Sequence, residues 1–184
     1  MNKFTRNSRE LLLENKWYSV YLDNVTTPVG TNFSEYYVIE CSNESVATLI
    51  INEKQEILFV HAFRYILDDV SLEIPCGNVE RNETIYDAAK RECEEETGYT
   101  VILKKQHYSY YPSNGISNQK IHIFFGVVNK ENKKNIFDQE EIKHVEWLGI
   151  EKVKKYVNNN EIKDGVTLTA LLLFFNKMEV SQIE

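Results

Sequence analysis

Cysteine is scarce in this chain of 184 residues, and its placement excludes two kinds of cross-link. The three cysteines, Cys41, Cys76 and Cys93, lie far apart, form no CxxC pair and have no histidine pair nearby. Neither a disulfide framework nor a structural zinc site is therefore expected. A reducing environment fits this cysteine usage best.

Long apolar runs are missing as well. No stretch approaches the length of a membrane span, and the N-terminal residues MNKFTRNSRELLLENKWYS lack the apolar centre of a signal peptide. We therefore expect a cytoplasmic protein that does not act in a membrane.

Basic residues are outnumbered. Lys and Arg total 21 against 28 Asp and Glu, which leaves a formal net charge of -7. Nonspecific nucleic-acid affinity comes mostly from Lys and Arg side chains that neutralise phosphates, so this balance argues against a nucleic-acid-binding protein. An acidic protein that handles phosphates would need a divalent cation between its carboxylates and those phosphates.

The overall composition is typical of a folded domain, with 42% hydrophobic and 27% charged residues. The length suits one well-packed core with a small addition, and the sequence has no internal repeat or low-complexity linker. We expect a strand-rich N-terminal unit over residues 1–42, ahead of a main α/β body over residues 43–184.

Segments 17–25 and 35–40 mix aromatic and β-branched residues with polar ones on either side of the turn residues TTPVGTNF, which predicts a hairpin. Dense β-branched and aromatic runs predict further strands at 45–52, 56–65, 70–77, 99–113, 120–129 and 143–150. Helices are expected over 84–97, which ends at Gly98, and over 165–178. Together these elements predict helices that flank a mixed sheet.

The first expected helix lies within GNVERNETIYDAAKRECEEETGY, a segment crowded with negative charge. Glu92, Glu95 and Glu96 are spaced i, i+3 and i+4, which puts three carboxylates on one helix face near the unfavourable C-terminal end of the dipole. Arg91 can pair with Glu95, but one guanidinium cannot neutralise three carboxylates. A hard cation such as Mg²⁺ can, because it takes oxygen ligands and shares them with substrate phosphates. The alternative is a solvated acidic helix face.

The same segment matches a known signature. Its specified positions are occupied by Gly77, Glu83, Arg91, Glu92, Glu95, Glu96 and Gly98. This pattern resembles the Nudix box, G-x5-E-x7-R-E-U-x-E-E-x-G-U, in which U is a bulky apolar residue. Cys93 and Tyr99 stand where an aliphatic residue is usual, and a buried cysteine behaves as a small hydrophobe. The chain therefore looks like a Nudix hydrolase.

The resemblance implies a Nudix fold, which is an α/β/α sandwich around a mixed sheet, and hydrolysis of a nucleoside diphosphate linked to another moiety. The implied metal site consists of Gly77, Glu83, Glu92, Glu95 and Glu96. Arg91 would orient the glutamates, and it belongs with them to the implied catalytic group. The expected cofactor is Mg²⁺, with Mn²⁺ as a possible substitute.

Flanking segments extend the resemblance to ADP-ribose pyrophosphatases and related nucleoside-diphosphate-sugar hydrolases. FRYILDDVSLEIPCG is similar to their QYR…LE-PAG segment, which implies substrate- or metal-binding roles for Arg64 and Glu73. YPSNGIS is similar to their PSPGFSDE loop, with Pro112 at the marker proline and Gly115 in the same loop. In that group a strand-rich N-terminal unit builds a homodimer and walls the nucleoside pocket. Trp17 could stack there on a base, or it could pack in a core or in the dimer interface.

One departure concerns the loop that would read SDE. Here it reads Ser117, Asn118 and Gln119, and a glutamine side chain cannot act as a base. Either that carboxylate is dispensable, or the substrate differs from ADP-ribose. Glu140 and Glu141 could supply the catalytic base, and an ordinary role as solvated loop acids is about equally plausible for each.

The histidines are isolated along the sequence, at positions His61, His107, His122 and His144. Structural or surface roles are expected for all of them.

These observations predict a Mg²⁺-dependent Nudix hydrolase that splits ADP-ribose or a related nucleoside diphosphate sugar into a nucleoside monophosphate and a sugar phosphate. Two alternatives stay open. The substrate could instead be GDP-mannose, a dinucleoside polyphosphate or a nucleoside triphosphate, or the chain could be a non-catalytic Nudix domain that senses a nucleotide sugar.

Overall fold

The computed structural model describes residues 3–104, 108–129 and 141–180. The chain divides into two compact units, the first made of residues 1–44 with 111–120, and the second of residues 45–110 with 121–184. No helix in the described ranges combines the length and the apolar content that crossing a bilayer requires.

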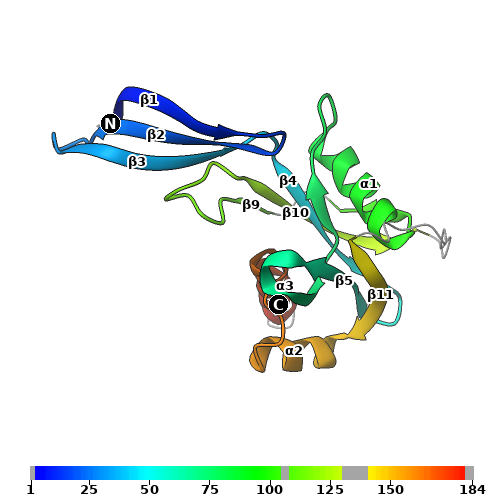
Figure 1. The fold of residues 1–184 in the computed structure, drawn as a ribbon. Coiled ribbons are helices and arrows are strands. Elements are labelled where there is room, and N and C mark those ends of the chain that lie inside the picture. The colour runs from blue at the N-terminus through cyan, green and yellow to red at the C-terminus, as the bar shows by residue number, and fades with distance from the viewer. Residues whose placement is uncertain (1–2, 105–107, 130–140, 181–184) are drawn as a thin grey trace. The chain divides into compact units, whose positions relative to one another are not determined.

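The first unit contains an antiparallel sheet of three strands, β1 (Thr5–Glu14), β2 (Tyr18–Thr26) and β3 (Asn32–Cys41), in that order (Figure 1). We call it the N-terminal sheet. The hairpin of β2 and β3 is confirmed. β1 was not predicted from the sequence, because its leucines at 11–13 are consecutive rather than alternating, and all three are exposed in the structure.

The segment 111–120 joins the first unit by bonding along β3. The amide of Ile39 donates to the carbonyl of Ile116 at 2.8 Å, and the amide of Asn118 donates to the carbonyl of Ile39 at 3.2 Å. The side chain of Asn118 also accepts from the Cys41 amide at 2.7 Å. This loop therefore belongs structurally with strands that lie far from it in sequence.

The second unit is built on a mixed sheet, with the order β11-β5-β4-β10-β8 and with β6, β7 and β9 paired to β5, β4 and β10. Its strands are β4 (Ser45–Ile51), β5 (Glu56–Arg64), β6 (Asp69–Glu73), β7 (Cys76–Asn78), β8 (Val101–Leu103), β9 (Tyr108–Tyr110), β10 (Ile121–Val128) and β11 (Ile142–Gly149). β4 and β10 run parallel, whereas the other pairs are antiparallel. The single strand expected over 99–113 is thus wrong in detail, because β8 and β9 are separate short strands.

The second unit also carries the helices α1 (Ile85–Thr97), α2 (Ile150–Asn158) and α3 (Gly165–Val180), with the short 3₁₀ helix η1 (Tyr65–Leu67) after β5. α1 begins at Thr84, whose side chain caps the Asp87 amide, and ends at Gly98, whose φ of 74° is left-handed. The predicted helices α1 and α3 are confirmed. α2 was not predicted, since its N-cap is Gly149, which provides no side-chain cap.

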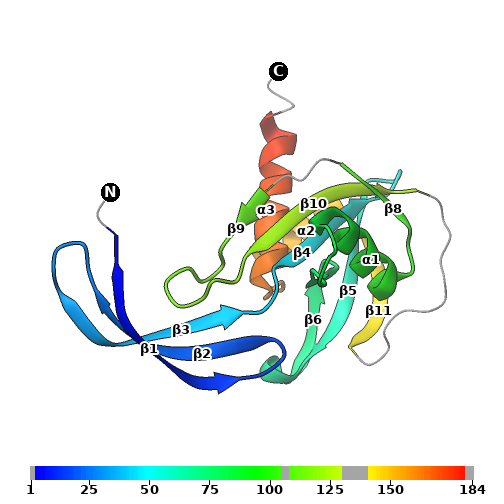
Figure 2. The same cartoon turned by 90° about the horizontal axis from the view of Figure 1, so that it is seen from above.

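Helices cover both faces of this sheet because successive residues of β4 point to opposite sides. Val46 and Ile50 pack in one buried cluster with Ala88, Ala89 and Cys93 of α1. Ala47 and Leu49 pack in another, whose helix residues are Val153, Ala170 and Leu171. Seen from above, α1 lies in front of the sheet, and α2 and α3 lie behind it (Figure 2). The α/β/α sandwich expected from the sequence is therefore confirmed.

Candidate active site

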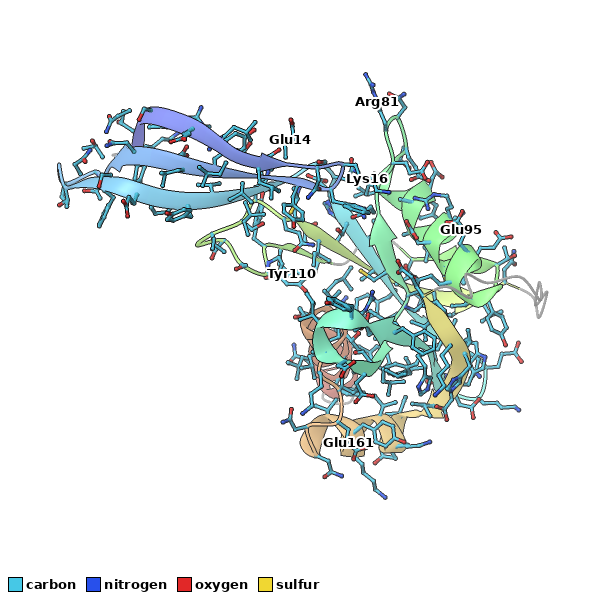
Figure 3. The ribbon with its side chains drawn as sticks, in the orientation of Figure 1. Glu14, Lys16, Arg81, Glu95, Tyr110 and Glu161 are labelled. Carbon is cyan, nitrogen blue, oxygen red and sulfur yellow. The ribbon has the colours of Figure 1, made fainter. Side chains whose placement is uncertain are left out.

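The candidate site is a cavity of about 470 Å³ in the second unit, beside the C-terminal half of α1. It is lined by Ser45, Arg64, Cys76, Gly77, Asn78, Glu80, Glu92, Glu95, Glu96, Glu141 and Ile142. Glu95 extends from α1 (Figure 3), and the helical spacing brings Glu92 and Glu96 to the same cavity. The three carboxylates that the sequence placed on one helix face therefore share one cavity.

Arg91 connects the acidic residues of this segment. Its Nε and Nη2 donate to the two oxygens of Glu83 at 2.9 and 2.8 Å. Its Nη1 lies 2.9 Å from an oxygen of Glu92 and 2.9 Å from an oxygen of Glu95. Nη2 also donates to the carbonyl of Asn78 at 2.9 Å, which anchors the guanidinium to β7. One cation thus holds three carboxylates in fixed positions.

Glu92 and Glu96 are partly buried, and burial disfavours the charged form of a carboxylate. Burial, with a smaller contribution from the nearby charge of Glu92, raises the pKa of Glu96 to about 8, although a 3.1 Å hydrogen bond from the Cys76 amide opposes the shift. Burial also raises the pKa of Glu92 despite its contact with Arg91. In contrast, the hydrogen bonds from Arg91 lower the pKa of Glu83.

Gly77 leaves room for the Glu92 carboxylate. A Cβ added at position 77 would lie 2.0 Å from Cδ of Glu92 and 2.2 and 2.3 Å from its two oxygens. Contacts shorter than 3.0 Å are essentially never made by real Cβ atoms. The glycine at the start of the signature therefore permits a close approach between β7 and the carboxylate of α1.

Arg64 and Glu73 form a bidentate ion pair next to this cavity. Nε and Nη2 of Arg64 donate to the two oxygens of Glu73 at 2.8 and 2.6 Å, and Glu73 is only 5% exposed. The third nitrogen of Arg64, Nη1, lies 3.9 Å from a carboxylate oxygen of Glu141. Because Glu73 occupies the other two nitrogens, Nη1 is the nitrogen of Arg64 that is best placed for a further anion.

The donor set of the cavity fits a hard divalent cation. Three carboxylates from adjacent turns line one space, and burial raises the pKa of two of them, Glu92 and Glu96. Arg91 compensates only part of their charge. Oxygen-rich sites of this kind suit Mg²⁺, whereas a thiolate or imidazole would be needed to favour softer ions.

A family model described as "NUDIX domain" matches residues 42–167, which is more than half of the chain. The chain belongs to the Nudix family. With every specified position of the box in place, it is a Nudix pyrophosphohydrolase, and Nudix hydrolases generally use divalent metal cations.

Several curated relatives are similar over most of the chain. ADP-ribose pyrophosphatase from Bacillus subtilis is 28% identical over 89% of this chain and 88% of that protein. The methanol dehydrogenase activator from Bacillus methanolicus is 27% identical over 88% of this chain and 87% of that protein. ADP-sugar pyrophosphatase from Mus musculus is 27% identical over 70% of this chain and 63% of that protein.

The Nudix cavity includes residues that the sequence did not single out. Ser45, Asn78, Glu80 and Ile142 line it, and Ser45 Oγ donates to the Asn78 side chain at 3.1 Å. Asn78 and Glu80 occupy unspecified positions of the box, so a motif comparison gives no signal for them. Glu83 does not line the cavity, because both of its oxygens face Arg91.

The other residues singled out from the sequence have different surroundings. Trp17, Pro112 and Gly115 belong to the first unit, where Gly115 lines a separate cavity of about 470 Å³ together with Tyr36 and the 111–118 loop. Trp17 is 57% exposed, and the ammonium of Lys16 lies 4.2 Å from the centre of its ring. Glu140 lies outside the described residues.

Proposed function

We propose that this Nudix hydrolase cleaves the pyrophosphate bond of ADP-ribose or a related nucleoside diphosphate sugar in the presence of Mg²⁺, and that Mn²⁺ can substitute. The products are a nucleoside monophosphate and a sugar phosphate. The observation that carries the proposal is the single cavity in which Glu92, Glu95 and Glu96 meet Arg64 and Glu141.

In this proposal Glu92, Glu95 and Glu96 hold the cation. The bound cation would neutralise charge on the pyrophosphate oxygens and polarise the phosphorus centre. Arg91 keeps Glu92 and Glu95 in position through contacts of 2.9 Å, so that the carboxylates do not rearrange during turnover. The proposed contribution of Gly77 is the space that allows Glu92 to occupy its observed position.

Arg64 and Glu73 are proposed to act together on the substrate. The bidentate pair fixes the plane of the guanidinium, which leaves Nη1 directed to the side where Glu141 lies. A phosphate oxygen there would gain a charge-assisted hydrogen bond without any reorganisation of Arg64.

Glu141 is proposed to accept the proton of the attacking water. As the water oxygen bonds to phosphorus, the bridging P–O bond breaks and the leaving phosphate departs. Glu141 lines the cavity, and its carboxylate is 69% exposed, so it can exchange the proton with solvent. Glu140 is the other candidate base. A base from this segment would make the amide at Gln119 compatible with catalysis.

The first unit is proposed to contribute Trp17, Pro112 and Gly115 to substrate binding and to form a homodimer. Its N-terminal sheet exposes large apolar side chains, including the leucines at 11–13 and Phe33, each between 45% and 49% exposed. Exposed apolar surface of this kind is typical of protein interfaces. Light scattering of the full chain would reveal a dimer, and a monomer at micromolar concentration would contradict this part of the proposal. The residues 1–42 would then form a unit without a role in association.

A cytoplasmic location remains part of the proposal.

The choice of substrate follows the relatives that are named for ADP-ribose and ADP-sugars, and it is tested by a substrate panel. Released phosphomonoester is measured with Mg²⁺ for ADP-ribose, other nucleoside diphosphate sugars including GDP-mannose, a dinucleoside polyphosphate and nucleoside triphosphates. The highest kcat/KM is expected for ADP-ribose or another nucleoside diphosphate sugar. Faster turnover of a triphosphate or dinucleoside polyphosphate would refute the substrate class. Tight binding of a nucleotide sugar without turnover would favour a sensing role.

The metal-site assignment has its own matched variants. Glu95→Gln with Glu96→Gln removes two carboxylates of the cavity, and turnover is expected to fall at least about a thousandfold because the cation is no longer held. Glu94→Gln changes the same helix at a residue that does not line the cavity, and it should leave turnover nearly unchanged. Near-normal turnover by the double variant would show that these carboxylates do not hold the cation.

A further inference from the structure

Two histidines that are distant in the sequence stand side by side in the second unit. His144 of β11 is paired directly with His61 of β5, and Glu146 follows His144 by two residues. Residues i and i+2 of a strand point to the same face of a sheet, so Glu146 joins the two imidazoles there. We call His61, His144 and Glu146 the histidine cluster.

The side chains of the histidine cluster are in contact. Nε2 of His61 lies 3.0 Å from a carboxylate oxygen of Glu146, and the rings of His61 and His144 stack with centroids 3.7 Å apart and planes inclined by 18°. One nitrogen or oxygen atom from each residue lies within 4.8 Å of the others. The His61 and Glu146 side chains are 21% and 36% exposed, and His144 is exposed, so solvent reaches the cluster.

The cluster is separate from the Nudix cavity. Leu148 lies on the same face of β11 as His144 and Glu146, because these residues are spaced two apart. Leu148 packs in the buried cluster with residues of α2 and α3. Trp147 packs on the opposite face with α1. None of the three cluster residues lines the Nudix cavity. Whatever the cluster binds is therefore not the cation of the box glutamates.

We propose that His61, His144 and Glu146 bind a divalent metal ion of intermediate softness, such as Zn²⁺ or Cu²⁺. Two imidazoles and one carboxylate are a common protein ligand set for such ions, which leaves a further position for water. Mg²⁺ is disfavoured because it prefers oxygen ligands, so the Nudix cavity and the histidine cluster would take different metals from the same solution.

Metal binding requires a small rearrangement of the rings. In a tetrahedral site with metal–nitrogen bonds of about 2.0 Å, ligand atoms are about 3.3 Å apart, which is closer than the present limit of 4.8 Å. Nearly parallel rings also direct their lone pairs along different lines. Rotation of one imidazole about its side-chain torsions meets both requirements and separates the stack. His144 is the ring that is free to turn, since it is exposed whereas His61 is bonded to Glu146.

A neighbouring ammonium group competes with a metal ion for Glu146. The ammonium of Lys152 on α2 lies 3.4 Å from the second oxygen of Glu146 and 5.3 Å from the centre of the Tyr156 ring. A bound metal would have to displace this cation or share Glu146 with it. Partial desolvation and the neighbouring His61 lower the pKa of His144.

A bound ion would link β5 to β11, and we call this link the cross-strand clamp. β5 and β11 change register between Ile142 and His144, so the ion would join the strands directly after this irregularity. Ile142 and Glu141, which precede it, line the Nudix cavity. The clamp proposal does not depend on the identity of the Nudix substrate, and its test does not use turnover.

The test uses the full chain without a polyhistidine tag, with excess Mg²⁺ to occupy the carboxylates of the Nudix cavity. Copper EPR is expected to show one site with nitrogen superhyperfine coupling from two imidazoles, and calorimetry is expected to show one Zn²⁺ equivalent. The double variant Glu95→Gln, Glu96→Gln should retain both signals. A copper spectrum with oxygen ligation alone would overturn the proposal.

Single-residue variants locate the site. His61→Ala and His144→Ala should each weaken Zn²⁺ binding at least about tenfold, with unchanged circular dichroism. Lys152→Ala should strengthen binding about threefold because it removes a competing cation from Glu146. His122→Ala, which removes a histidine of β10 outside the cluster, is the matched control and should leave Zn²⁺ affinity unchanged. Unchanged affinity in His61→Ala and His144→Ala, or weaker binding in Lys152→Ala, would refute the assignment.

Discussion

The substitution Gly77→Ala tests whether the position of one carboxylate controls the Nudix reaction. The new Cβ would lie 2.0 Å from Cδ of Glu92, whereas real Cβ contacts are essentially never below 3.0 Å, so the carboxylate has to move by at least 3.0 - 2.0 = 1.0 Å. The carboxylate of Glu92 lies at the end of a flexible side chain, so it can move by that distance without unfolding the helix. The expected defect is therefore in the site and not in the fold.

A displacement of this size is large for catalysis. A misplacement of about 1 Å can lower turnover about a hundredfold, and we expect kcat/KM of Gly77→Ala to fall by roughly that factor. The Mg²⁺ concentration needed for half-maximal activity should rise about tenfold or more, because Glu92 no longer meets its partners with the same geometry. The melting temperature should change by no more than about 5 °C, as for a perturbation of about 1 kcal/mol.

Gly165→Ala is the matched control. A Cβ at position 165 would have no heavy atom within 4 Å, and the residue lies in the first turn of α3 in the same unit. Normal turnover is expected for it. Phosphomonoester release over a Mg²⁺ series measures both variants. If Gly77→Ala kept its kcat/KM within about threefold of the unaltered protein, the close approach of β7 to Glu92 would not matter for catalysis.

Two further predictions concern buried charge. Because burial raises the pKa of Glu96 from 4.5 to about 8, the folded metal-free protein retains a proton that the unfolded chain loses, so its stability should fall as pH rises between these values. Glu96→Gln should flatten that fall in thermal unfolding with EDTA, and an equally steep fall would contradict the assignment. Arg64→Leu should lower the free energy of unfolding in urea by about 3 kcal/mol because it leaves buried Glu73 unpaired. Arg64→Leu with Glu73→Leu should recover most of that loss, and an equal loss in both variants would refute the reasoning.

The parts of the fold that could be predicted from sequence are those set by local interactions. The cap at Thr84, the left-handed Gly98 and the i, i+3, i+4 spacing of the glutamates all lie within one helix, so α1 and its acidic face followed directly. α2 was missed because it starts immediately after a strand, at Gly149, without a capping side chain.

The parts that could not be predicted depend on strand register. His61 and His144 meet only because β5 and β11 are adjacent with one particular pairing, and a shift of one residue would send His144 to the other face of the sheet. The isolated positions of these histidines in the sequence therefore gave no sign that their rings stack. The same reason applies to Ile39 and Ser117, which form a parallel bridge within the first unit.

The membership of residues 111–120 in the first unit has a practical consequence for cutting this chain into pieces. Both flanks of the segment, β9 and β10, belong to the second unit, so the polypeptide passes between the units at residues 44–45, 110–111 and 120–121. A truncation at residue 44 would separate β3 from the loop that hydrogen-bonds along it, so the N-terminal fragment would lack part of its unit and the C-terminal fragment would keep residues 111–120 without their partner strand. The first unit therefore cannot be excised as one continuous piece of the chain, and an attempt to express it alone has to supply residues 111–120 as well.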